Sequence, residues 1–285
     1  MTENINPLQK YYRQPAIYIK LPSGGKYYPK EVFTPTETGE IPILPMTAKD
    51  EMTFKTPDSM INGQATVDVI KSCVPNLLDP WRMVNYDTDV ILLAIRIATY
   101  GETMEVNYNV PITDEQQTTA VNLPAVLEDL GRITIEDFTV TSKGFKVKIQ
   151  PLDYKTLTRV QIARFEQQKI FGTIDASTLT EDQKQTAFAK SFETINTVNF
   201  SLLLDSIQEI TTPDGTVVTD KNQIIDFVNN ADTKTIKEIE EKLTELRLQA
   251  QVKPVKIKAT DEQIKKGVPA TFELPITFDN SNFFG

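Results

Sequence analysis

The sequence contains no histidine and a single cysteine, Cys73, among its 285 residues. A Ser-His-Asp or Cys-His catalytic system, a histidine metal triad, a cysteine-rich zinc site and an intramolecular disulfide therefore cannot be built from this chain alone. Any enzymatic chemistry would have to use carboxylates, lysine, tyrosine, serine or the one thiol. A lone cysteine is also typical of a protein made in a reducing cytoplasm.

Cationic clusters and long apolar runs are equally scarce. Lysine and arginine total 30 against 39 aspartates and glutamates, which leaves a net charge of −9, whereas a protein that tracks phosphates needs a clustered cationic surface. The longest uninterrupted apolar run, residues 90–95, is followed by Arg96. It is well short of the roughly 18 residues of a membrane span. We therefore expect no nucleic-acid partner and no membrane partner.

The first 46 residues differ from the rest in composition. They hold seven of the 17 prolines and five of the nine tyrosines, and proline at this density predicts extended pieces joined by turns. Residues 16–21 are a strand candidate, followed by a turn at 22–25. Tyrosine offers a large amphipathic face with few rotatable bonds, so this arm either covers a neighbouring protein or folds onto its own domain. The candidate partner-binding residues are Tyr11, Tyr12, Tyr18, Tyr27 and Tyr28.

Two adjacent aromatic residues, Phe283 and Phe284, lie at the C-terminal end of the sequence. Because chain ends usually fray, these rings either fold back onto the protein or occupy a pocket of another one. We add both to the candidate partner-binding residues.

The chain from Thr47 to residue 150 alternates between helical and strand patterns. Thr47 and Asp50 have the spacing of a capping box, which predicts the start of a first helix. The periodicity of apolar residues predicts further helices over 58–74 and 87–101. Alternating apolar residues predict one small antiparallel layer that also includes a short helix: the strands cover 104–110, 133–140 and 145–149, and the helix 123–130.

Helices and one hairpin dominate the chain after Pro151. A helix is predicted from its cap, Asp153, to about residue 171, where Gly172 follows as a stop signal. A capping box at 180–183 predicts the start of a long helix that reaches about residue 204. The remaining predicted elements are a hairpin over 206–218 with its turn at 212–215, helices over 221–229 and 234–252, and strands over 255–258 and 270–278.

Helices that alternate with short antiparallel hairpins predict an α+β fold with an extended N-terminal arm. We expect three regions along the chain. They are a Tyr/Pro-rich arm over 1–46, a domain of helices and antiparallel strands over 47–150, and a mainly helical region with C-terminal strands over 151–285.

The motifs that could carry chemistry each have a stronger structural interpretation. Residues 23–26, Ser-Gly-Gly-Lys, lack the upstream glycine and the following Ser or Thr of a phosphate loop and predict a hairpin turn. Three acidic pairs lie at helix ends or turns, where carboxylates usually cap or stay solvated: Asp87 with Asp89, Glu128 with Asp129, and Glu136 with Asp137. Cys73 is predicted to be a small buried residue. The core face of a packed helix is predicted at Ile236, Ile239, Leu243 and Leu246. We predict no catalytic residue, metal ligand or cofactor.

Several segments of the sequence resemble a known protein family. They are residues 21–28 (LPSGGKYY), 43–51 (ILPMTAKDE), 56–70 (beginning TPD), 79–101 (beginning DPW) and 274–284 (beginning LPITFD and ending FF). These segments are similar to the baseplate hub and hub-assembly proteins of contractile-tailed phages related to the T-even group. Some members of that family carry cysteine pairs that suggest a bound metal. Residues 102–110 and 269–278 of this chain contain no cysteine, so the resemblance implies no metal here.

The resemblance implies a virus-encoded tail protein that helps to build the baseplate hub through protein–protein contacts, without catalysis. Its partners would be other tail or baseplate proteins in an oligomeric assembly formed in the host cytoplasm, and the protein either stays in the tail baseplate or leaves after assembly. One alternative is a transient chaperone, for example of the tape-measure protein. Another is a carboxylate-based hydrolase. On the leading hypothesis, deletion of residues 1–20 or of the last five residues should abolish complex formation and leave the fold intact.

Overall fold

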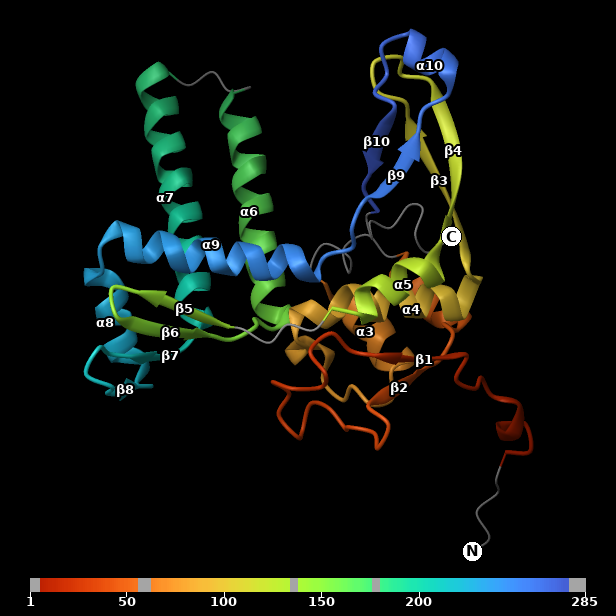
Figure 1. Ribbon diagram of the computed structural model, residues 1–285, viewed down its shortest axis with the longest axis horizontal. Coiled ribbons are helices and arrows are strands. Elements are labelled where there is room, and N and C mark those ends of the chain that lie inside the picture. Colours follow the sequence, from red (N-terminus) through yellow and green to blue (C-terminus); the bar gives the residue numbers. More distant parts are fainter. Residues whose placement is uncertain (1–5, 56–62, 134–137, 176–179, 277–285) are drawn as a thin grey trace, which may run out of the picture.

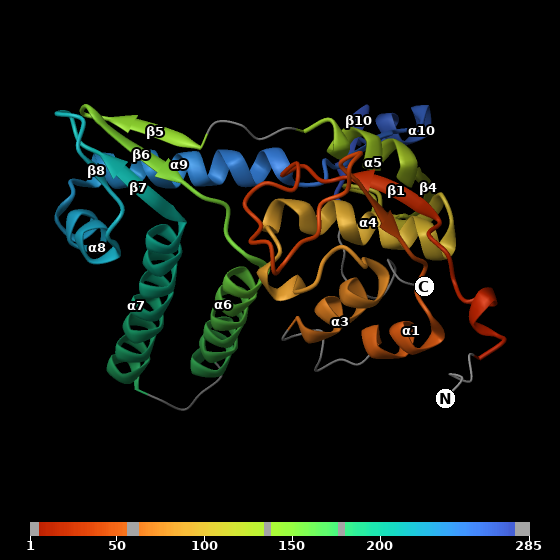
Figure 2. The ribbon, with the colours of Figure 1, turned by 90° about the horizontal axis from the view of Figure 1, so that it is seen from below.

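The computed structural model describes residues 6–55, 63–133, 138–175 and 180–276. Over these residues the chain combines helices with short antiparallel strand pairs, and the predicted α+β class is confirmed. Figures 1 and 2 show a body from which two thin projections extend, a helical hairpin and a pair of β-ribbons.

The N-terminal part of the body contains the arm and the first helices. Its elements are the short 3-10 helix η1 (Gln9–Tyr11), β1 (Ile17–Lys20), β2 (Glu40–Ile43), α1 (Ala48–Phe54), α3 (Gln64–Cys73), η2 (Pro80–Arg82), η3 (Asn85–Asp87) and α4 (Thr88–Tyr100). The predicted capping box is confirmed, since the Thr47 hydroxyl accepts from the backbone N–H of Asp50 and the Asp50 carboxylate accepts from that of Thr47. Gly101 ends α4 as predicted. The predicted start of the second helix at Asp58 lies outside the described residues.

The first hydrophobic core forms around α4. This helix is buried on nearly all sides, as its almost continuous apolar sequence requires. It packs among β1, β2 and α3, and Ile41, Ile43, Ile70, Ile91 and Leu93 are wholly or almost wholly buried there.

The middle of the chain forms separate sheets. Its elements are β3 (Thr103–Asn109), β4 (Gln116–Asn122), α5 (Leu123–Gly131), β5 (Thr139–Ser142) and β6 (Phe145–Ile149). The prediction of one small layer is wrong, because β3 pairs with β4 alone among the described strands, whereas β5 and β6 belong to a four-stranded sheet. The polar strand β4, whose sequence is QQTTAVN, supplies the partner that apolar alternation did not reveal.

The C-terminal part completes this sheet and adds most of the helices. Its elements are α6 (Tyr154–Asp175), α7 (Glu181–Ser206), β7 (Ile207–Thr211), β8 (Val217–Val218), α8 (Lys221–Asn230), α9 (Thr233–Ala250), β9 (Val255–Lys258), α10 (Asp261–Lys265) and β10 (Thr271–Leu274). The antiparallel sheet has the order β5-β6-β7-β8, so strands from both sides of residue 151 share it. The domain limits at residues 46 and 151 stay predictions.

The second hydrophobic core lies between this sheet and the helices α8 and α9. The predicted core face of α9 is confirmed, because Ile239 and Leu246 are buried there and Ile236 and Leu243 pack against the cluster. The partly buried residues Tyr28 and Ile133 touch both cores.

The helical hairpin of α6 and α7 projects from the body, with the two helices side by side in both ribbon views (Figures 1 and 2). The predicted stop at Gly172 is wrong, since α6 continues through it to Asp175. A glycine inside a helix costs only about 1 kcal/mol relative to alanine. The burial of Ile174 and the stacking of Phe171 on Phe188 of α7 favour the longer helix.

The second projection consists of the β3–β4 and β9–β10 ribbons, which lie beside each other (Figure 1). The rings of Tyr108 and Phe272 are 5.8 Å apart, and the Lys266 ammonium lies 2.7 Å from the Glu115 carboxylate. The C-terminal strands predicted from the sequence therefore pair with each other and lean on the β3–β4 ribbon. The end of the strand predicted over 270–278, after residue 276, lies outside the described part of the chain.

Candidate functional site

The N-terminal arm is fastened to the body by Arg13. Its guanidinium donates to the carbonyl of Pro45, to the carbonyl and hydroxyl of Ser72 (both 2.7 Å), and to Asp50 Oδ2 at 3.1 Å. Burial opposes the charge on Asp50, but the donors of Thr47, Ser72 and Arg13 outweigh it and lower the pKa of this carboxyl. The chain from Arg13 onward is thus part of the body, and β1 adds the buried Ile19 to the first core.

This attachment changes the deletion expected from the sequence. Removal of residues 1–20 would take away both Arg13 and the strand that pairs with β2. We now expect this deletion to destabilise the fold, because the segment contributes to the core. A cut before Arg13 removes only the segment 6–12 of the described chain, which we call the arm tip.

The arm tip presents large side chains to solvent. Leu8, Tyr11 and Tyr12 have exposed fractions of 63%, 74% and 55%. Ordered but uncovered amphipathic residues of this size are typical of surfaces that contact another protein. Tyr18, on β1, is exposed as well.

The last two candidate tyrosines lie next to each other but have different surroundings. Tyr27 is partly exposed, has a left-handed backbone (φ 69°), and its ring contacts Phe138 edge-on at 5.2 Å. Tyr28 points inward, where its hydroxyl donates to Asp87 and accepts from the backbone N–H of Val84. Phe283 and Phe284 lie outside the described residues.

Tyr28 leads to a buried carboxyl, Asp87, that sequence reasoning left among solvated acids. Asp87 is fully buried and accepts from the backbone N–H of Ser23 (2.9 Å), the Ser23 hydroxyl (2.6 Å) and the Tyr28 hydroxyl (2.7 Å). Burial raises its pKa to about 6, although the three donors oppose this shift. A turn is present at 23–26, but the predicted hairpin is wrong, because β1 pairs with β2, which begins only at Glu40. Ser23 joins this turn to the start of α4.

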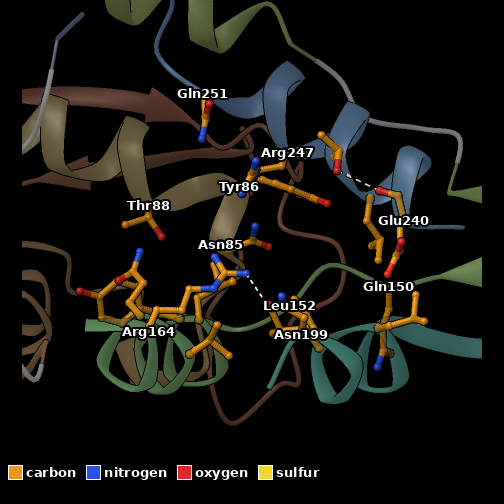
Figure 3. Close-up of a pocket in the computed structure, with 18 of the residues that line it drawn as sticks. Asn85, Tyr86, Thr88, Gln150, Leu152, Arg164, Asn199, Glu240, Arg247 and Gln251 are labelled. Carbon is orange, nitrogen blue, oxygen red and sulfur yellow. Dashed lines mark hydrogen bonds between the residues drawn. The ribbon is translucent and has the colours of Figure 1, made fainter. Parts of the chain in front are cut away.

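A cleft of about 550 Å³ lies between η3 with the start of α4, the base of the α6–α7 hairpin, and α9 (Figure 3). The close-up shows Arg164 and Asn199, from α6 and α7, on one side and Glu240 and Arg247, from α9, on the other. The Arg164 guanidinium donates to the Asn199 side-chain oxygen at 2.6 Å. The cleft therefore separates α9 from the base of the hairpin.

Asp89 lines this cleft, whereas Asp87 does not. Burial raises the pKa of Asp89 to about 6, although the backbone N–H of Val252 donates to this carboxylate and opposes the shift. Asp87 of the first acidic pair is therefore buried against Ser23 and Tyr28, whereas Asp89 lines the cleft. Asp87 and Asp89 therefore do not face this cleft as a pair.

The other sequence candidates have structural surroundings. Glu128 and Asp129 are exposed and bind Arg132 of the next helical turn, and Glu136 and Asp137 lie outside the described residues. The predicted burial of Cys73 is confirmed, and burial raises the pKa of its thiol to about 12. Within the described part of the chain, acidic and cysteine side chains form no group of three that could hold a metal ion. No helix there is both long and apolar enough to cross a membrane.

Sequence reasoning missed the apolar surface of the α6–α7 hairpin. Phe165, Ile170 and Phe192 are all more than two-fifths exposed on these two helices. Because apolar residues lie on several sides of both helices, neither helix shows one apolar stripe that could have predicted its partners.

The sequence model of the family described as T4 bacteriophage base plate protein matches residues 15–273. The chain belongs to this family. No curated protein and no solved structure matches it. Membership confirms the resemblance to phage baseplate proteins and indicates a structural protein of the phage baseplate, which contacts other baseplate or tail proteins.

Some candidate residues of this baseplate-family protein lie inside the matched region and others lie outside it. It contains Arg13's neighbours Pro45, Asp50 and Ser72, as well as Asp87 and the α6–α7 hairpin. It begins after Tyr11 and Tyr12 and ends before Phe283 and Phe284. Those four aromatic residues are therefore candidates on the basis of their own chemistry.

Proposed function

We propose that this protein helps to build the hub of the phage baseplate through protein–protein contacts, without catalysis. The observation that carries the proposal is the arm tip, whose Leu8, Tyr11 and Tyr12 stay uncovered although Arg13 fixes the chain immediately behind them. A fixed base reduces the conformational entropy that the arm tip loses when it binds a neighbour. Assembly would take place in the host cytoplasm, and the protein would remain in the tail baseplate.

The remaining aromatic candidates extend this proposal. Tyr18 and Tyr27 add exposed ring surface on the same segment of the chain. Phe283 and Phe284 would supply a second contact at the other end. The hydroxyl of Tyr28 is engaged by Asp87 and Val84, so we assign this residue a positioning role within the arm.

The test is a substitution of the arm tip in the full chain. Leu8→Ala, Tyr11→Ala and Tyr12→Ala together should sharply reduce incorporation into baseplates, measured by quantitative mass spectrometry of particles from infected cells. The melting temperature should stay close to that of the wild type, because none of the three side chains belongs to a core. Val217→Ala, at a residue of similar exposure on β8, is the matched control. Full incorporation of the triple variant would contradict the proposal.

A second candidate function is a transient chaperone, for example of the tape-measure protein. The exposed apolar residues of the projecting α6–α7 hairpin favour it, since a chaperone needs apolar surface for an incomplete partner. Purified mature tails separate the two functions. A fixed stoichiometry of this protein in such tails supports the hub component, whereas its absence supports the chaperone.

A further inference from the structure

Two contacts between α6 and α7 define one face of the helical hairpin. Near the base, Arg164 donates to Asn199 at 2.6 Å. Towards the tip, the rings of Phe171 and Phe192 lie 5.2 Å apart. Residues 164 and 171 are seven apart on α6, as are 192 and 199 on α7, and seven residues are almost two helical turns. Both contacts therefore lie on the same face.

The basal part of this face already has a helix opposite it. Arg164 and Asn199 line the cleft together with Glu240, Leu243 and Arg247 of α9. In Figure 1 α9 crosses the base of the hairpin, and the outer parts of α6 and α7 extend beyond it. This helix is amphipathic, with Ile239 and Leu246 buried in the second core.

The outer part of the same face is aromatic and partly exposed. Phe171 stacks on Phe188 at 5.6 Å and contacts Phe192, and we call these three residues the aromatic face. Phe192 is 57% exposed. Where two helices project from a body and pack on each other, such rings stay partly covered, and apolar surface left exposed in this way marks interaction sites.

The spacing of the two contacts indicates what would cover the aromatic face. Seven residues of α-helix span about 10.5 Å, which is close to the 10–12 Å diameter of a helix with its side chains. A second helix that lies alongside α9 would therefore reach the aromatic face. A strand is disfavoured, because it requires unpaired backbone groups of a sheet edge, whereas this face offers side chains of helices.

We propose that the aromatic face binds an amphipathic helix of another baseplate protein, placed beside α9 across the hairpin. This inference rests on the proposed assembly function and adds a further contact, independent of the arm tip and of the C-terminal phenylalanines. The partner helix should present apolar residues at three- and four-residue spacing, since this pattern forms the single stripe that the three rings can contact.

Site-specific photocrosslinking in infected cells tests the proposal with the full chain. Benzoylphenylalanine replaces Phe192 in one variant and Val217, which is equally exposed on β8, in the control. We expect residue 192 to crosslink to another baseplate protein, and mass spectrometry should map the crosslink to a segment with the three-four apolar spacing. A signal no greater than that of residue 217, a crosslink to a second copy of this chain, or a partner segment without that spacing would each overturn it.

A charge substitution distinguishes this inference from the proposed function. Phe192→Glu should reduce incorporation into baseplates at least tenfold, while circular dichroism stays that of the wild type. Phe192→Ala removes the ring without adding a charge and should also reduce incorporation. This second variant keeps the test valid where the charge of Phe192→Glu perturbs the helices. Full incorporation of both variants, combined with a loss in the arm-tip variant, overturns the helix-binding site alone. Full incorporation of all three contradicts the assembly function as well.

Discussion

Asp87 shows how a single carboxyl joins segments that are distant in the sequence. Three donors from Ser23 and Tyr28 converge on it at the start of α4, more than fifty residues further along the chain. Placing a charge in this sealed position costs solvation free energy, which is why its pKa rises to about 6. In the unfolded chain the same carboxyl returns to the ordinary pKa of about 4. Between about pH 4 and pH 6, the Asp87 carboxyl therefore takes up a proton when the chain folds.

This proton linkage predicts the direction of a pH effect. Because the folded state holds the proton up to a higher pH, the contribution of Asp87 to the free energy of unfolding is fully present below about pH 4 and is lost as pH rises through about 6. Between pH 5 and pH 7 the loss amounts to about 1 kcal/mol. Asp87→Asn does not titrate, so the difference in stability between wild type and variant should shift by that amount in favour of the variant. Urea unfolding at both pH values measures it, and a difference that stays constant would contradict the assignment.

Arg13 predicts a second effect at the scale of one residue. Arg13→Ala leaves the Ser72 carbonyl and the Asp50 carboxylate without their shared donor, and hydrogen bonds to charged groups contribute about 1.5–3 kcal/mol. We expect the free energy of unfolding to fall by about 2 kcal/mol and amides of β1 to exchange faster. Arg132→Ala is the control, because its ion pairs are exposed and should contribute less than about 1 kcal/mol. Equal losses in the two variants would rule out a special role of Arg13.

At the scale of elements, local chemistry predicted helices better than it predicted strand partners. The capping boxes at Thr47 and Thr180 and the stop at Gly101 depend on neighbouring residues alone, and all three are confirmed. Gly172 was misleading, because packing on α7 outweighs the small cost of glycine in α6. The order of the β5–β8 sheet depends on contacts between strands more than fifty residues apart, which no local pattern contains.

The candidate site was predictable in the same uneven way. An abundance of tyrosine and proline pointed to the arm, where Tyr11 and Tyr12 are exposed, and their binding role stays a prediction. The burial of Asp87 was not predictable, since only the folded turn brings Ser23 and Tyr28 to it. The aromatic face was missed for a similar reason: its rings come from two helices, so neither helix alone carries an apolar stripe.

Gly63 gives a prediction about how α3 meets α6. Gly63 and Gly39 both have left-handed backbones, with φ of 77° and 73°. A Cβ at Gly63 would lie 2.9 Å from Thr158 Cγ2 of α6, whereas at Gly39 it would meet nothing within 4 Å. Gly39→Ala should therefore cost only the backbone strain, about 1–2 kcal/mol, and Gly63→Ala should cost clearly more. Chemical denaturation of both variants measures the free energy of unfolding. Equal losses in the two variants would show that α6 can move away from Gly63 at no cost.

At the scale of the whole molecule, the two hydrophobic cores meet at Tyr28 and Ile133. Tyr28 packs against the first core and against the second, and its hydroxyl lies between Asp87 and the backbone of Val84. The first core contains the nearly fully buried α4, whereas the second consists of a four-stranded sheet with α8 and α9 on it. Tyr28 is therefore placed to couple the unfolding of the two cores.

Tyr28→Phe tests this coupling while keeping the ring. The variant leaves Asp87 without one donor and the Val84 N–H without its acceptor, and an unsatisfied buried group costs about 1–3 kcal/mol. We expect a loss of this size in the free energy of unfolding, together with faster hydrogen exchange in β7 and α8 than in α4, because the link between the cores is weakened while the first core stays intact. Tyr18→Phe, at an exposed ring, should change neither quantity. If exchange in Tyr28→Phe rises equally in both cores, the protein unfolds as one unit and the hydroxyl stabilises it without linking two parts.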